Sequence, residues 1–292
     1  MHSDFCSDWY FYFSSIMDKR CFSVGNCNGF NSYEFCPILC YVVCSFPPIF
    51  GFFIPVIILV SNSLYAFDYE PINTFVQPFL NSIFVSFLSA NFVVFFSFFI
   101  VSYSNESKSK YIKLLAGISS TGYAFPGTML AIGVVIFIGF LDDTISLVDN
   151  YVLQIPDYFY FGGTFFVLLF AYVVRFQAIG FGALSSGLQK IPQNLFSASR
   201  CLGKSFTGTT FKITLPLLFP FLLAGGLLVF VDTMKELPMT LLLRPFNFET
   251  LATQAYQYAH SELMAEASVP ALLIIASGLV PVFLMNKLMR EV

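Results

Sequence analysis

Four charged residues that could do chemistry stand close together in the last third of the chain: Asp232, Lys235, Glu236 and Arg244. They follow a long apolar run, and charges near a membrane interior usually face water or one another. Carboxylate oxygens suit a hard cation, so the group is a candidate part of an ion pathway. The simpler interpretation is an ion pair at the membrane interface, in which Lys235 neutralises Asp232 or Glu236. The spacing assembles no metal site, and we predict no metal ligand and no catalytic residue.

A second group of suggestive residues lies within residues 191–216, between two apolar runs. Pro192 suits the first turn of a helix, and Gly203 suits the left-handed position that ends one. Ser205 can cap a second short helix, and Pro216 opens the next apolar run. We therefore predict a helix–turn–helix on the membrane surface, with an apolar stripe available to a partner.

The same stretch contains a relaxed phosphate-loop pattern that ends in Gly203-Lys204-Ser205. The strict pattern has Gly where Ala198 stands, and a working phosphate loop follows a buried strand in an α/β domain. The chain has no room for such a domain at this place. We interpret the match as a coincidence, so the chain is not expected to be an enzyme, to bind a cofactor or to hydrolyse ATP.

Three of the seven cysteines, Cys36, Cys40 and Cys44, are four residues apart and would share one helix face. A metal site would need a His or a carboxylate nearby, and the sequence offers none. Since Cys also serves as a small apolar filler, neither a metal site nor a disulfide is expected here.

The elements that must position these residues are membrane helices. Of the 292 residues, 57% are hydrophobic and only 11% are charged, whereas about 25% are charged in ordinary soluble domains. An apolar run of about 20 residues spans a bilayer as a helix. We predict an all-α integral membrane protein with six transmembrane helices, near residues 38–63, 78–103, 114–140, 159–180, 214–233 and 269–286. No basic patch stands clear of these spans, so nucleic-acid binding is not expected.

The basic residues predict the orientation of the spans, because Lys and Arg concentrate in cytoplasmic loops. If the N-terminus is inside, 12 of the 14 basic residues, Arg175 among them, fall on the cytoplasmic side, and only Lys235 and Arg244 fall outside. We predict two cytoplasmic termini, a cytoplasmic N-terminal segment at 1–36, and one six-helix domain at 37–292, in contact with membrane lipid.

The predicted cytoplasmic loop resembles that of the binding-protein-dependent ABC importers. Their loop reads Glu-Ala-Ala, three residues, Gly, nine residues, Ile, one residue, Leu-Pro, and the spacing here is the same. The matching positions are Ser197, Ala198, Ser199, Gly203, Ile213, Leu215 and Pro216. In that family the loop docks on a separate ATPase subunit, so the resemblance implies a dimeric ATPase partner that uses the ATP. The chain departs from the family at Ser197, where Glu is usual, and at Ser199. The loss of the acid at Ser197 removes an ionic contact.

Three further stretches, 230–253, 122–128 and 51–56, resemble the ferric-iron permeases within that family. The resemblance covers roughly residues 45–285 and matches only the second half of permeases that usually contain two six-helix halves. It implies the MetI-like bundle of importer permeases in the bacterial inner membrane, with ferric iron as cargo and a periplasmic iron-binding protein as partner. A complete pathway would need a second permease half or a homodimer.

Other functions fit parts of the same sequence. The same kind of permease could carry thiamine, a phosphonate, a polyamine or an oxyanion. A secondary transporter driven by an ion gradient would have acidic or His residues in midspan, but His2 and His260 lie outside the predicted spans and no span centre carries an acid. An enzyme would need a buried polar constellation, which the sequence does not reveal. We therefore favour the importer permease.

Overall fold

The computed structural model describes residues 43–66, 71, 73–107, 109–148 and 162–290. The chain divides into two compact units, Met1–Pro55 and Val56–Val292. In the first unit, residues 43–55 are helical; they include η1 (Ile49–Phe53), after which α3 (Ile54–Ala66) begins. The segment 1–36, predicted to be cytoplasmic, lies outside the described residues.

The described part of the second unit is helical. Its long helices are α4 (Asn73–Glu106), α6 (Gly127–Val148), α7 (Phe165–Lys190), α10 (Leu215–Met234) and α13 (Met264–Arg290). Its short helices are α5 (Lys110–Ser119), η2 (Gly122–Ala124), α8 (Gln193–Cys201), α9 (Phe206–Thr209), η4 (Thr210–Thr214), α11 (Pro238–Leu243) and α12 (Leu251–His260).

Six helical stretches of the described chain are long and apolar enough to cross a membrane. They are Val43–Ala66, Asn73–Glu106, Gly127–Ile145, Phe165–Lys190, Phe206–Met234 and Met264–Met285. The predicted fold class and the predicted number of spans are thereby confirmed.

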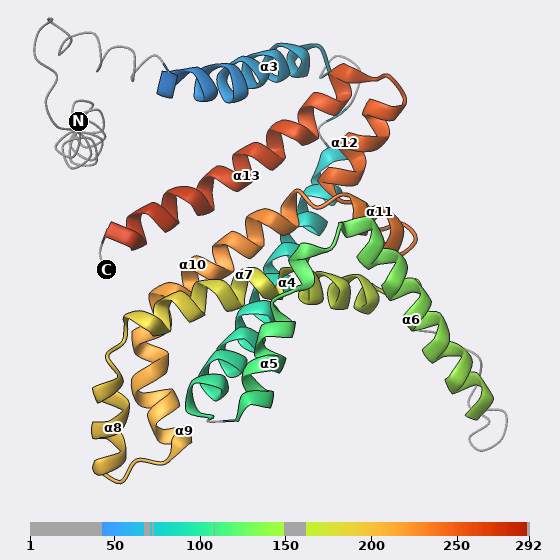
Figure 1. Ribbon diagram of the computed structural model, residues 1–292. Coiled ribbons are helices and arrows are strands. Elements are labelled where there is room, and N and C mark those ends of the chain that lie inside the picture. The colour runs from blue at the N-terminus through green and yellow to red at the C-terminus, as the bar shows by residue number, and fades with distance from the viewer. Residues whose placement is uncertain (1–42, 67–70, 72, 108, 149–161, 291–292) are drawn as a thin grey trace, which may run out of the picture. The chain divides into compact units, whose positions relative to one another are not determined.

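Helices α4, α7 and α10 pack against one another and form the centre of the second unit (Figure 1). One core cluster, around Tyr172 and Phe176 of α7, also takes in side chains of α6 and α11. A second cluster, around Leu184 of α7 and Leu218 of α10, includes Phe196 of α8. The short helix α8 is therefore anchored directly in the core that the long helices share.

Small residues allow these helices to approach closely, as they do at many helix contacts in membranes. A Cβ atom at Gly180 of α7 would lie 2.5 Å from Ser97 Oγ and 2.7 Å from Val93 Cγ1 of α4. A Cβ atom at Gly225 of α10 would lie 3.1 Å from the Cβ of Ala183. The central packing therefore depends on residues that lack bulk.

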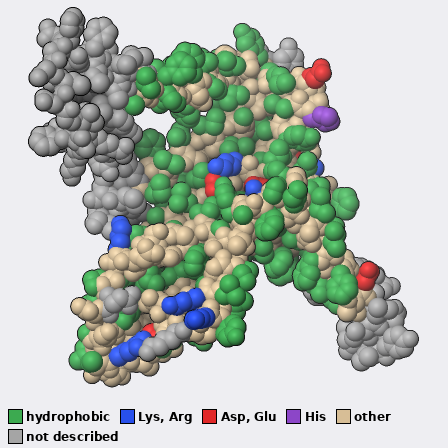
Figure 2. Space-filling model, viewed as in Figure 1, with side chains coloured by type: hydrophobic (Ala, Val, Ile, Leu, Met, Phe, Trp, Pro, Cys, Tyr) green, Lys and Arg blue, Asp and Glu red, His purple; other side chains and the backbone are tan. Residues whose placement is uncertain are grey.

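The outer faces of the second unit are apolar, with exposed side chains such as Phe87 and Phe95 of α4 and Ile136 and Phe140 of α6. Figure 2 shows hydrophobic side chains over most of the visible face, while Lys and Arg gather toward the end that carries α5, α8 and α9. This distribution suits a surface covered by lipid or by another membrane protein, with one basic end in water.

The third span differs from the prediction of one helix at 114–140. Helix α5 ends at Ser119, where Ser120 Oγ and Thr121 Oγ1 donate hydrogen bonds back to the carbonyls of Gly117 and Ile118. Pro126 disfavours helical backbone at the residue before it, and Phe125 is extended, with φ −86° and ψ 138°. The predicted span is therefore broken between α5 and α6.

The fourth span also differs from the prediction, because α7 continues to Lys190 instead of ending near residue 180. Arg175 consequently lies well inside a membrane-spanning helix. The prediction that counted Arg175 among the cytoplasmic basic residues is wrong, and the polar connection begins at Ile191.

The fifth span begins earlier than predicted, because α9, η4 and α10 form one continuous helical stretch, Phe206–Met234. Pro216 lacks the N–H group that an α-helix would use at this position. The turn just before it is the wider π-helical η4, a form found mostly as single turns inside α-helices. The second short helix of the predicted surface loop is thus the beginning of the span itself.

Candidate functional site

The turn between α8 and α9 has the geometry that the sequence suggested. Gly203 adopts φ +74°, which a residue without a Cβ tolerates best. Its N–H donates to the carbonyl of Arg200 at 2.9 Å, and the N–H of Lys204 donates to that of Ser199 at 3.1 Å. These two bonds make up the Schellman motif that ends many helices. Ser205 accepts a hydrogen bond from the N–H of Gly208 and caps α9.

Buried contacts fix α8 against the following helix. Ser199 Oγ lies 2.7 Å from Thr209 Oγ1, and both residues are buried. The side chain of Phe196 is buried in the second core cluster. Ser199 departs from the family's usual residue, and its hydroxyl is the group that bonds α8 to α9.

The opposite face of α8 is open. Ser197 and Ala198 are exposed, and Leu195 and Leu202 are 42% and 80% exposed. The remaining residues of the predicted loop motif lie within the first part of the fifth span: Ile213 and Leu215 are partly buried, and Pro216 is exposed. The loop therefore presents apolar side chains on one face of a short helix, while the other face of this helix is packed against the bundle.

An ion pair joins this loop to the end of another span. Arg200 of α8 pairs with Glu106, the last residue of α4. Both side chains are partly exposed, so the pair adds little to stability, but it places α8 beside the end of α4.

Residues 198–205, which fit the relaxed phosphate-loop pattern, run from the last turn of α8 into the turn that follows it. A phosphate loop instead joins a strand to a helix. The surroundings of this segment are those of the loop motif and not those of a nucleotide site.

A second candidate site lies inside the bundle, around Glu236. Its carboxylate faces Arg175 of α7, with 3.5 Å between Oε1 and Nη1. Glu236 is 8% exposed. Within the described residues, Glu236 Oε1 and Arg175 Nε and Nη1 are buried without a hydrogen bond. The two charges therefore neutralise each other across the bundle without a close hydrogen bond.

Aromatic and hydroxyl groups surround the pair. The guanidinium of Arg175 lies 5.9 Å from the ring centre of Tyr123 and 5.8 Å from that of Phe176, a distance at which an aromatic face attracts a cation. Tyr172 and Thr240 are buried and share a hydrogen bond between their hydroxyls. Thr240 also donates to the backbone carbonyl of Glu236.

Gly127, the first residue of α6, completes this cluster. A Cβ atom there would lie 2.1 Å from Arg175 Nη1 and 2.8 Å from Glu236 Oε1. A Cβ at Gly122 would lie 2.1 Å from the carbonyl oxygen of Val174. The break between α5 and α6 is thus pressed against α7 at the level of Arg175, so two stretches far apart in sequence meet there.

The structure brings three of the four predicted charged residues together and separates the fourth. Asp232 and Lys235 pair at 2.7 Å, as the simpler interpretation held, and both act electrostatically on Glu236. Arg244 pairs instead with Glu249 at 2.6 Å. Of the two partners that this interpretation allowed for Lys235, the structure shows Asp232, whereas Glu236 forms its ion pair with Arg175.

These contacts shift two pKa values. The hydrogen bond to Asp232 raises the pKa of Lys235. Burial raises the pKa of Glu236, and the neighbouring Arg175 opposes that rise. No group of three or more His, Cys, Asp or Glu side chains gathers as a metal site in the part of the chain that the structure describes. Among the described cysteines, Cys44 and Cys201 are free thiols, whereas Cys36 and Cys40 lie outside the described residues.

Sequence reasoning overlooked Arg175, Tyr172, Thr240 and Gly127 as site residues. One signal was available, because Arg175 is the single charged residue between Phe165 and Gln189, and an ionisable residue inside a membrane helix marks a functional site by default. The expectation that the sequence holds no buried polar constellation is wrong for the same reason.

Six helical stretches long enough to cross a membrane and a loop anchored in the core of the second unit indicate an integral membrane protein. The chain belongs to the family of binding-protein-dependent transport system inner membrane components, whose family model matches residues 100–290. The prediction of an ABC importer permease is confirmed, and the secondary transporter is set aside.

Two curated relatives carry different cargo names. The chain is 26% identical over 251 residues to the Fe(3+)-transport system permease protein FbpB 2 of Haemophilus influenzae. The aligned region covers 82% of this chain and 46% of that protein. It is 27% identical over 128 residues to the putative 2-aminoethylphosphonate transport system permease protein PhnV of Salmonella typhimurium. The aligned region covers 44% of this chain and 47% of the PhnV protein. The chain therefore spans about half the length of the curated relatives it matches.

A solved structure shares the fold. A chain of a bacterial alginate ABC transporter, crystallised with a periplasmic protein that carries an alginate pentasaccharide, superimposes with a TM-score of 0.69 at 16% identity. The superposition covers 89% of this chain and 95% of that chain. It confirms the importer-permease bundle that the resemblance implied.

Proposed function

We propose that this permease imports ferric iron. The observation that carries the proposal is the extent of similarity to the ferric-iron permease, 82% of the chain, compared with 44% for the phosphonate permease. Two of the three stretches whose resemblance first suggested iron, 122–128 and 230–253, also meet in the structure. Gly127 from the first and Glu236 from the second both lie against Arg175.

The proposed partners follow from the two ends of the bundle. A dimeric ATPase subunit, which uses the ATP, docks on the loop motif from Ser197 to Pro216, where Leu195 and Leu202 offer exposed apolar contact. A periplasmic iron-binding protein delivers cargo at the other end. This arrangement places the basic end of Figure 2 and both termini in the cytoplasm, in agreement with the positive-inside rule.

The cargo pathway is proposed to run beside the cluster of Asp232, Lys235, Glu236 and Arg175. A pathway between two bundles needs a second bundle, supplied by a separate permease half or by a second copy of this chain. We propose no iron ligand in this cluster, because each carboxylate in it already faces a cation.

The experiment is an uptake assay in cells that lack their own ferric-iron importers. This permease would be expressed together with its ATPase and its binding protein, and radiolabelled ferric iron would be supplied with and without excess 2-aminoethylphosphonate, thiamine or spermidine. Uptake that depends on the permease and resists all three competitors supports iron. Uptake of radiolabelled aminoethylphosphonate, without iron uptake, would make phosphonate the cargo and leave the permease class intact.

A further inference from the structure

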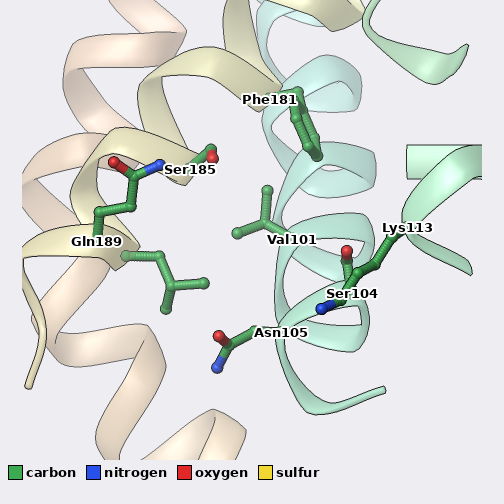
Figure 3. A pocket seen from close by; sticks show the side chains of 8 residues that line it. Val101, Ser104, Asn105, Lys113, Phe181, Ser185 and Gln189 are labelled. Carbon is green, nitrogen blue, oxygen red and sulfur yellow. The ribbon is translucent and has the colours of Figure 1, made fainter. Parts of the chain in front are cut away.

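A cavity of about 420 Å³ opens between the ends of α4, α5 and α7, outside the Arg175–Glu236 cluster (Figure 3). Its polar lining consists of Ser104, Asn105, Lys113, Ser185 and Gln189. Figure 3 shows Lys113 extending from α5 toward α4. Three separate helices therefore turn polar side chains toward one space at the basic end of the bundle.

The lining selects for an anion. Lys113 is the one charged residue in the lining, and it forms no ion pair with a described residue. The hydroxyl and amide side chains around it can all donate hydrogen bonds. A metal cation, including a cargo cation, would find no carboxylate among the lining residues.

The charged residues around the cavity also favour an anion. Glu106 follows the lining residue Asn105, but its carboxylate pairs with Arg200. Lys110 lies one turn from Lys113 on α5, and Lys190, which follows Gln189, lies over the ring of Phe221 at 5.1 Å. The described charges near the cavity therefore sum to a positive potential.

The cavity also has an apolar side, formed by Val101, Phe181 and Leu188. A free ion such as inorganic phosphate would leave this side in contact with water. A ligand that joins an anionic group to an organic body would cover it, and pockets of a few hundred Å³ suit such ligands.

We propose that this cavity binds the phosphate group of an anionic phospholipid, with Lys113 facing the phosphate. The cavity lies where α4 and α7 end, at residues 106 and 190, and basic pockets between the ends of membrane helices bind lipid head groups in this way. The bound lipid contacts the last turn of α7, which leads through Ile191 directly into α8. The site thus adjoins the loop proposed to meet the ATPase, and it does not depend on the identity of the cargo.

The test measures thermal unfolding of the full chain in neutral detergent. Phosphatidylglycerol is titrated against phosphatidylcholine, with inorganic phosphate in a separate arm. A ligand that binds the folded state raises the unfolding temperature in a concentration-dependent way. We expect phosphatidylglycerol alone to do so. Lys113→Gln should weaken the apparent affinity about five-fold, and Asn105→Asp, which adds an acid to the same lining, should weaken it further.

Lys110→Gln is the matched control, because it removes the same charge from the same helix without touching the lining. An equal loss of affinity in Lys110→Gln and Lys113→Gln would show non-specific attraction to the basic end and overturn the site. So would unchanged binding in both Lys113→Gln and Asn105→Asp. A temperature rise with inorganic phosphate, abolished by Lys113→Gln, would keep the phosphate site and replace the lipid by a soluble ligand.

Discussion

Arg175 and Glu236 place two opposite charges among apolar helices, where each depends on the other. Removing one partner of a buried pair leaves an uncompensated charge, which commonly costs about 3–5 kcal/mol. We therefore expect Arg175→Met to lower the stability of the solubilised protein by about that amount, measured as the midpoint of thermal unfolding. Arg244→Met is the control: its pair with Glu249 is more exposed, and we expect a loss of about 1 kcal/mol or less. Equal losses in the two variants would contradict the buried role of Arg175.

The penalty in Arg175→Met should depend on pH. Burial raises the pKa of Glu236 and Arg175 opposes that rise, while Asp232 raises it and Lys235 lowers it by smaller amounts. Without Arg175 the folded state binds the proton of Glu236 more tightly than the unfolded state does. Stability then falls as the pH rises from the unfolded pKa through the folded pKa. Unfolding curves of wild type and variant should lie closer together at mildly acidic pH than at neutral pH, and a gap independent of pH would exclude a charged Glu236 as the cause.

The left-handed backbone of Gly203 leads to a prediction about the loop. A β-branched residue at φ +74° adds roughly 1–2 kcal/mol of strain and disturbs the two hydrogen bonds that end α8. Gly203→Val should leave membrane insertion nearly unchanged, while binding of the ATPase in a pull-down and iron uptake both fall. Gly117→Val is the control, because Gly117 has open space around it. Full binding and full uptake in Gly203→Val would show that this loop is not the docking element.

At the scale of elements, some features follow from local sequence and others do not. Long apolar runs predict spans because any such run must avoid water, and Gly203 and Ser205 predict the turn because both act on their own backbone. The contact between Arg175 and Glu236 joins residues far apart in sequence, and no local pattern encodes it. Pro126 indicates an irregularity near Phe125. Because membrane helices tolerate Pro, the sequence alone does not distinguish a kinked helix from two separate helices.

The close packing of α4 and α7 can be tested at Gly180. Leu at this position would have to displace Ser97 and Val93, which lie within 3 Å of its Cβ. Overpacking of this kind commonly costs about 1–3 kcal/mol, so the unfolding midpoint of Gly180→Leu should fall clearly. Gly182→Leu, two residues along the same helix and with nothing within 4 Å of its Cβ, should change it little. A harmless Gly180→Leu would mean that α4 and α7 do not approach so closely.

At the scale of the whole molecule, the proposed orientation can be tested with reporter fusions. Alkaline phosphatase is active outside the cytoplasm and green fluorescent protein fluoresces inside it. A fusion after Gly203 should fluoresce, and a fusion after Glu249, beyond the fifth span, should show phosphatase activity. The reverse pattern would place the loop motif on the side without ATP and would remove the argument for an ATPase partner.

The unbroken helix from Phe206 to Met234 has a mechanical consequence. Its 29 residues join the turn at Gly203, just before one end, to the Asp232–Glu236 charges at the other, and the stretch, which contains η4 and Pro220, is bent (Figure 1). A movement of α8 is therefore linked to the Arg175–Glu236 pair through one continuous helical backbone, with no loop in between.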